Sequence, residues 1–116
     1  MLSTTTDTQT RVRIHLVDYS MGSSASVLDF YGDRDPVEVA RSYLKRSLYI
    51  THMTLHSAYS GEAAAEDMFD LSNNPGREEE RQRVYGRARS LSVGDIVGVG
   101  DQLWLCCPTG WREVIQ

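Results

Sequence analysis

The most distinctive part of this sequence is the stretch Arg87-Ala88-Arg89-Ser90-Leu91-Ser92-Val93-Gly94-Asp95-Ile96-Val97. Gly94 permits a positive φ, and Ser92 or Asp95 can accept backbone hydrogen bonds, so the stretch is typical of a tight turn that leads into a strand. Three short apolar runs follow, separated by turns rich in glycine. These runs are Ile96–Val99, Leu103–Cys106 and Trp111–Ile115. The C-terminal part therefore predicts a three-stranded β-meander.

Three further strands are indicated upstream of this meander. Apolar and polar residues alternate from Arg11 to Asp18, which predicts a first strand. The segment Val27–Tyr31 follows a Gly-Ser loop, and we expect a second strand that pairs back on the first as a hairpin. The segment Tyr49–His56 is rich in β-branched and aromatic residues, and we expect it to be the central strand of the sheet.

Helices are predicted in three places. Asp35 followed by Pro36 is typical of a helix start, and this helix is expected to run to about Leu48. The other two are expected at Gly61–Leu71, after a Ser60 cap, and at Arg77–Tyr85, as a short solvated helix. The predicted fold is α+β, with two to three helices on a small mixed or antiparallel sheet. Residues 11–116 should form a single domain after a loose tail of residues 1–10.

Composition excludes several classes of protein. The 116 residues are 41% hydrophobic and 24% charged, with a formal net charge of -4, which are ordinary globular values. This balance argues against a broadly basic nucleic-acid binder and against an acidic DNA mimic. No run approaches the roughly 18 apolar residues of a membrane helix, and the first residues lack the pattern of a signal peptide. We therefore expect a cytoplasmic protein with no membrane partner.

The cysteines and histidines show no recognised metal-binding spacing. Cys106 and Cys107 are adjacent, which favours free structural thiols, with a reactive or ligating thiol as the alternative. His52 and His56 would lie roughly 13 Å apart on one face of a strand. His15 would lie near them only if the two strands pair, which would reopen the question of a metal site. We expect no metal and no cofactor.

Catalytic motifs are equally lacking. The serines of the distinctive stretch do not form the Gly-x-Ser-x-Gly elbow of hydrolases, and its glycines lie among strands rather than before a helix, where a phosphate loop would need them. The sequence therefore favours a non-enzymatic protein without catalytic residues. A small hydrolase that uses a histidine or a cysteine is the weaker alternative.

Candidate binding residues cluster in the C-terminal third. Arginines close to tryptophans are typical of surfaces that contact single-stranded nucleic acid, whereas the glutamates among them favour a solvated, ion-paired face. The paired asparagines suit a helix C-cap or a recognition loop. The candidate set is Asn73, Asn74, Arg77, Arg81, Arg87, Arg89, Ser92, Asp95, Trp104 and Trp111.

The block from about Phe69 to Val114 contains Leu71-Ser72-Asn73-Asn74-Pro75, the run of Arg and Glu that follows, Tyr85-Gly86, Arg89–Val97 and Cys106–Trp111. With these residues the block resembles small YodL-like proteins carried by phages, plasmids and conjugative elements. The resemblance implies an accessory protein of a mobile element and carries no activity with it.

We therefore expect a protein that binds a host or element-encoded protein and modulates host defence or element maintenance. The alternative is a module that binds single-stranded or modified nucleic acid through its arginine and tryptophan side chains. The exposed edges of a small sheet also leave room for a homodimer.

Overall fold

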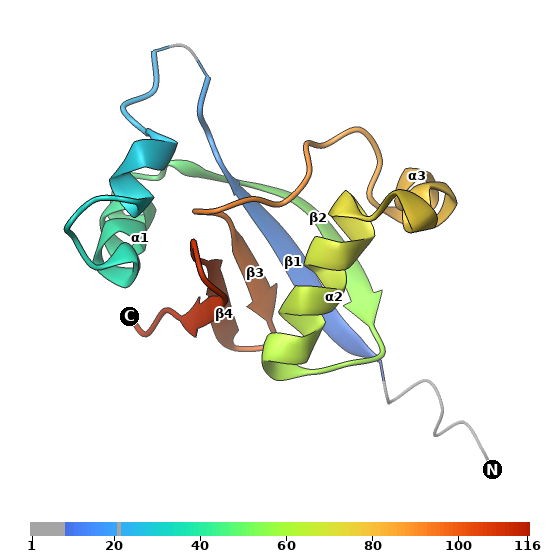
Figure 1. The fold of residues 1–116 in the computed structure, drawn as a ribbon. Helices are drawn as coiled ribbons and strands as arrows, with labels where there is room; N and C mark the ends of the chain where they lie inside the picture. The colour runs from blue at the N-terminus through green and yellow to red at the C-terminus, as the bar shows by residue number, and fades with distance from the viewer. Residues whose placement is uncertain (1–8, 21) are drawn as a thin grey trace.

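The protein is described here by a computed structural model, which covers residues 9–20 and 22–116. Its strands are β1 (Thr10–Val17), β2 (Tyr49–Ser57), β3 (Ile96–Val99), β4 (Gln102–Cys106) and β5 (Trp111–Glu113). Its helices are the 3₁₀-helices η2 (Val27–Phe30) and η3 (Pro75–Arg77) and the α-helices α1 (Pro36–Lys45), α2 (Gly61–Asn73) and α3 (Glu78–Val84). The predicted α+β class is confirmed (Figure 1). Most of the predicted N-terminal tail lies outside the described residues, and β1 already begins at Thr10.

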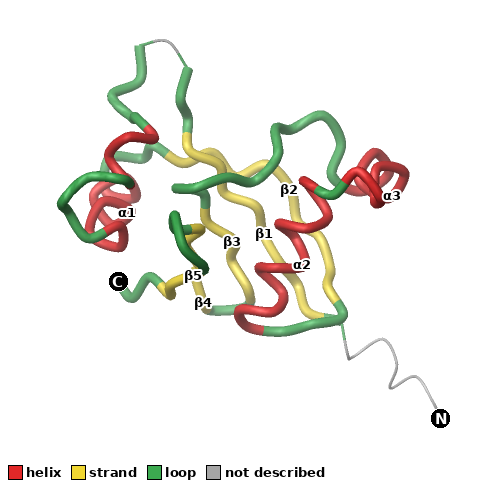
Figure 2. The backbone as a smooth tube through the Cα atoms, viewed as in Figure 1, coloured by secondary structure: helices red, strands yellow, loops and turns green. Residues whose placement is uncertain are grey.

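All five strands form one antiparallel sheet in the order β2-β1-β3-β4-β5 (Figure 2). The predicted C-terminal meander is confirmed, since β3 pairs with β4 and β4 pairs with β5. All four residues of β3 are buried, as expected for the middle strand of a sheet covered on both faces.

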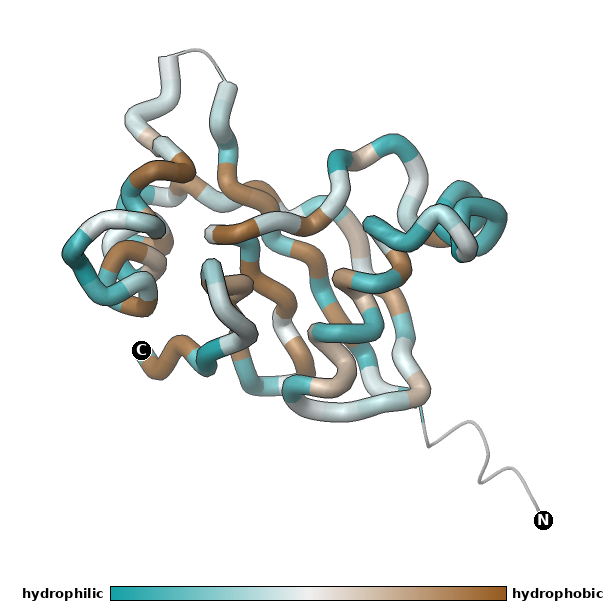
Figure 3. Tube along the Cα trace, viewed as in Figure 1, coloured by the Kyte–Doolittle hydropathy of each residue, from teal (hydrophilic) through white to brown (hydrophobic). Residues whose placement is uncertain are grey.

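Both faces of the sheet are covered. Successive residues of β3 point to opposite faces, and each face contributes to a different core. Val97 joins a core with α2, whereas Ile96 joins a core with α1 and η2. Figure 1 shows α2 lying across the sheet and α1 well apart from α2, and in Figure 3 the hydrophobic positions gather on the middle strands. The first core includes Val12, Ile14, Leu16, Met68 and Leu71; the second includes Phe30, Val39, Tyr43 and Leu105.

Helix α1 starts where the sequence predicts and ends earlier. The Asp35 carboxylate accepts a hydrogen bond of 2.9 Å from the Val37 amide, which caps the helix. The helix ends at Lys45 rather than at Leu48, because Ser47 takes a positive φ of 57° and the Leu48 amide turns back to the Tyr43 carbonyl at 2.9 Å.

Helices α2 and α3 match the prediction closely. The apolar residues Ala64, Met68 and Leu71 of α2 are buried, and the chain leaves the helix at Asn74. None of the residues of α3 is buried, so this helix is the solvated element that its charge pattern indicates.

The segment Val27–Tyr31 is a 3₁₀-helix and not the predicted hairpin strand. The Ser26 hydroxyl accepts a hydrogen bond of 3.2 Å from the Leu28 amide and so starts a turn. Phe30 is 1% exposed and Leu28 is 73% exposed, which lets one aromatic ring reach the second core from a short turn. A cap and one buried ring therefore override the β propensity of this segment.

Strand β2 lies at the edge of the sheet, so its predicted central position is wrong. Five of its nine residues are exposed, and the middle position belongs to β3. The reason is topological: β1 pairs on one side with β2 and on the other with β3, which comes from the far end of the chain. Local β propensity does not distinguish an edge strand from a central one.

Candidate binding cleft

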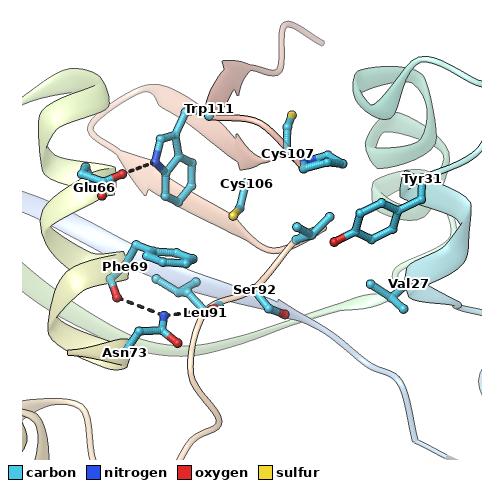
Figure 4. Close-up of a pocket in the computed structure, with 13 residues that line it drawn as sticks. Val27, Tyr31, Glu66, Phe69, Asn73, Leu91, Ser92, Cys106, Cys107 and Trp111 are labelled. Carbon is cyan, nitrogen blue, oxygen red and sulfur yellow. Dashed lines mark hydrogen bonds between the residues drawn. The ribbon is translucent and has the colours of Figure 1, made fainter. Parts of the chain in front are cut away.

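An open cleft lies between α2, η2 and the turn that joins β4 to β5 (Figure 4). Its volume is about 450 Å³, which is within the usual range of ligand pockets. We call it the Trp111 cleft. It is lined by Glu66, Phe69 and Asn73 of α2, by Leu91, Ser92 and Val93, by Val27 and Tyr31, and by Cys106, Cys107, Pro108, Gly110 and Trp111.

Two aromatic rings form one wall of the Trp111 cleft. The rings of Phe69 and Trp111 meet edge to face, with centroids 6.2 Å apart and an interplanar angle of 87°. The indole Nε1–H of Trp111 donates a hydrogen bond of 2.8 Å to Glu66 Oε1. Both contacts hold the indole in one orientation, so this wall is preformed.

The segment before β3, which also lines the cleft, is fixed to α2 by hydrogen bonds. The Asn73 amide donates to the carbonyl oxygens of Phe69 and Leu91, each at 3.0 Å. The Leu91 amide in turn donates to Ser72 Oγ at 3.1 Å. Asn73 therefore joins the end of α2 to the segment before β3, while the adjacent Asn74 occupies the C-cap position of α2 and its Oδ1 accepts from Gly76 N at 2.9 Å.

Next to the lining residue Val93, a fully buried carboxylate ties the distinctive stretch to β1. Asp95 is 0% exposed and accepts hydrogen bonds from the amides of Val17 and Ser92, at 2.9 and 2.8 Å. Arg89 donates to both oxygens of Asp95, at 2.6 and 2.8 Å, and to the Val17 carbonyl at 2.9 Å. The hydrogen bond to Asp95 raises the pKa of the Arg89 guanidinium. We call Val17, Arg89, Ser92 and Asp95 the Asp95 junction. Its ion pair between Arg89 and Asp95 has a structural role.

Two further arginines of the predicted set, Arg77 and Arg81, are also held by intramolecular partners. Arg77 pairs with Glu80, Asp67 and Asp70 at 2.8 to 3.0 Å, and the bond to Glu80, followed by those to the two aspartates, raises the pKa of Arg77. The guanidinium of Arg81 stacks on the ring of Tyr85. It also donates hydrogen bonds to the backbone carbonyls of Ser72, Gly86 and Ala88.

These contacts divide the predicted candidate set. Three of its members line the Trp111 cleft: Asn73, Ser92 and Trp111. The other seven do not line it. Arg87 is exposed in the turn that follows α3, and the indole of Trp104 packs against the first core and donates to Gln102 at 3.2 Å. The predicted residues therefore do not form one surface.

Several cleft residues escaped sequence analysis. Glu66 and Phe69 were missed, although they lie seven and four residues before the predicted Asn73, and this helical spacing is the signal that places all three on one face of α2. Val27 and Tyr31 could not have been assigned, since their segment was expected to be a strand.

The cysteines are free thiols buried at the base of the cleft, each 6% exposed. Burial, and to a smaller extent the Asp95 carboxylate, raises the pKa of Cys106 to about 12, and burial also raises the pKa of Cys107. Both thiols are therefore protonated at neutral pH and serve as apolar lining.

We expect both thiols to react slowly with a disulfide reagent in the folded protein. At pH 8 the reaction should be about a hundred times slower than in denaturant, because only the thiolate attacks and burial suppresses it. Absorbance of the released thiol, with and without denaturant, measures both rates. Rapid reaction of either cysteine in the folded protein would contradict the assignment as lining residues.

The three histidines do not gather around one point. His15 Nδ1 and Thr51 Oγ1 share a hydrogen bond of 2.7 Å, and burial, together with Arg13, lowers the pKa of His15. His56 lies opposite Arg11, and His52 is an extra residue at a register shift in β2. Within residues 9–20 and 22–116, no three His, Cys, Asp or Glu side chains are placed to hold a metal ion.

Comparisons with known proteins give no relative. The chain matches no protein-family model, no curated protein sequence and no solved structure. The resemblance to YodL-like proteins therefore stays a prediction. In the described part of the chain, no helix has both the length and the apolar character that crossing a membrane requires.

Proposed function

We propose that this protein acts by binding another protein, and that the Trp111 cleft receives one large apolar side chain from an extended segment of that partner. The observation that carries the proposal is the aromatic wall of Phe69 and Trp111, which is preformed and opens to solvent. Preformed apolar pockets with a few polar groups at the rim are typical binding sites for such anchors.

The cleft, at about 450 Å³, is large enough to receive such an anchor together with the backbone beside it. Burial of a leucine or phenylalanine side chain contributes about 2 kcal/mol, which corresponds to roughly a thirtyfold change in Kd. The Ser92 hydroxyl and the Glu66 carboxylate lie at the rim, where they can accept hydrogen bonds from the backbone amides that flank the anchor.

The charged groups favour a protein ligand over single-stranded nucleic acid. Phosphate binding needs guanidinium groups that are free to leave their present partners. Arg77 and Arg89 are ion-paired with carboxylates, and Arg81 holds three backbone carbonyls. Breaking these contacts would cost more than a surface phosphate contact returns.

The cleft supports binding rather than catalysis. Its thiols have raised pKa values, its tryptophan N–H is bonded to Glu66, and its asparagine N–H groups are bonded to backbone oxygens. As to context, the resemblance of Phe69–Val114 to YodL-like proteins supports an accessory role in a phage or another mobile element. The bound protein would belong to the host or to the element, and binding would modulate host defence or element maintenance.

Selection from a displayed library of random peptides tests the proposal. We expect enriched peptides to share one aromatic or large aliphatic residue. Ser92→Trp should weaken their binding at least tenfold, because the indole occupies the cleft while the backbone amide to Asp95 is kept. Gln82→Trp, on the exposed face of α3, is the matched control and should bind as the unchanged protein does.

Two outcomes would contradict the proposal. One is that no peptide is enriched; the other is that Ser92→Trp and Gln82→Trp bind equally well. Titration of labelled single-stranded oligonucleotides at two salt concentrations covers the alternative, since phosphate contacts weaken steeply with salt. Salt-dependent binding of the oligonucleotides would favour the nucleic-acid function.

A further inference from the structure

The outer edge of β2 has the properties of a pairing surface. An edge strand presents unpaired backbone N–H and C=O groups, and proteins usually protect such an edge with charges or proline. The nine residues of β2, Tyr49-Ile50-Thr51-His52-Met53-Thr54-Leu55-His56-Ser57, include no Asp, Glu, Lys, Arg or Pro. The opposite edge of the sheet is protected, because β5 has three residues and two of them are Arg112 and Glu113.

We propose that β2 pairs with β2 of a second copy of this chain, antiparallel and around a two-fold axis, so that one sheet runs through both copies. An antiparallel edge is complementary to itself under a two-fold rotation, since each outward N–H meets a C=O of the other copy and each outward C=O meets an N–H. A second copy therefore fits this edge without any additional partner.

The regular part of β2 sets the register. His52 is a bulge that interrupts the strand, whereas Met53–Ser57 pairs regularly with β1. An axis at Leu55 places Leu55 opposite its own copy and Thr54 opposite His56. Thr54 and His56 point to the same face of the sheet, where a hydroxyl and an imidazole can form a hydrogen bond.

The surroundings of this strand leave room for the second copy. A hollow of about 390 Å³ flanks Leu55 between β2, α2 and α3, and the partly exposed Val84 lies along it. On the other face the nearest charges are Arg11 and Arg13 of β1. Equivalent arginines of the two copies would be three strand spacings apart, about 14 Å, which exceeds the Debye length at physiological salt.

Sedimentation velocity from low to high micromolar concentration tests the proposal. We expect a reversible shift to twice the 13.1 kDa mass of the chain. Replacing Thr54→Lys together with His56→Lys should abolish the shift, because the new lysines face each other across the axis. Gln82→Lys with Ile115→Lys adds the same charge elsewhere on the surface and should leave it unchanged. Circular dichroism verifies that each variant is folded.

Hydrogen exchange of the unchanged protein gives a second readout, which does not depend on the folding of any variant. The amides of Thr54 and His56 should lose protection on dilution, because they alternate with the residues that bond to β1 and so point to the outer edge, while those of the buried β3 should keep theirs. A monomer at every concentration would overturn the proposal. So would a dimer that persists in the folded lysine variant, or one whose concentration-dependent protection lies outside β2.

Discussion

Replacement of Gly94 by alanine is expected to destabilise the fold by about 3 kcal/mol, the sum of a positive-φ penalty and of overpacking. Gly94 has a φ of 98°, and an added Cβ would lie 2.7 Å from a ring carbon of Phe30 and 2.8 Å from the hydroxyl of Tyr19. Phe30 is 1% exposed and packed in the second core, so it has no room to move away.

Gly100→Ala separates the two causes. Gly100 also has a positive φ, 58°, but an added Cβ would meet nothing within 4 Å. We therefore expect a loss of only about 1 kcal/mol, from the backbone conformation alone. Chemical denaturation measures both variants; equal losses would contradict the added cost of the clash with Phe30 and Tyr19.

Breaking the Asp95 junction is expected to have a similarly large effect. Asp95→Ala and Arg89→Ala should each destabilise the protein by about 3 kcal/mol, because each leaves buried polar groups without their partner. Asp95→Ala orphans the amide of Val17, and Arg89→Ala leaves the fully buried carboxylate without its counter-charge.

The double variant tests whether these residues act as one unit. Its loss should be smaller than the sum of the two single losses by at least about 1 kcal/mol, since the second substitution removes a group that the first has already orphaned. Denaturation of all four proteins gives the coupling free energy. Additive losses would mean that Arg89 and Asp95 act independently. Arg89 would then again be a candidate residue for ligand binding.

Sequence analysis predicts the elements that local chemistry determines. The Asp35-Pro36 start of α1, the apolar face of α2 and the C-terminal meander were all predicted from short-range patterns, and the structure confirms them. Local signals are strong here because caps, helical spacing and glycine turns act within a few residues of one another.

The errors concern long-range packing. The Val27–Tyr31 segment has β propensity, but Phe30 packs in a core with α1. No local sequence pattern predicts this contact. The edge position of β2 depends on the pairing of β1 with β3, across more than 80 residues of chain. Both outcomes are tertiary effects that override propensity.

The candidate site was predicted only in part, for the same reason. The cleft joins residues from four separate segments of the chain, so only Asn73, Ser92 and Trp111 could be proposed from the sequence. The arginine cluster is visible in the sequence, but its partners are not. The ion pairs of Arg77 and Arg89 show that the cluster supports the architecture beside the cleft.

The two tryptophan side chains offer the most direct test of the proposed binding site. Trp111 lines the cleft and Trp104 does not, so their indole N–H signals in a ¹⁵N–¹H correlation spectrum report on binding inside and outside it. Trp104→Phe assigns the two signals. On titration with a selected peptide, we predict that the Trp111 signal shifts and that the Trp104 signal stays in place. A shift of Trp104 with an unchanged Trp111 would contradict binding in the cleft.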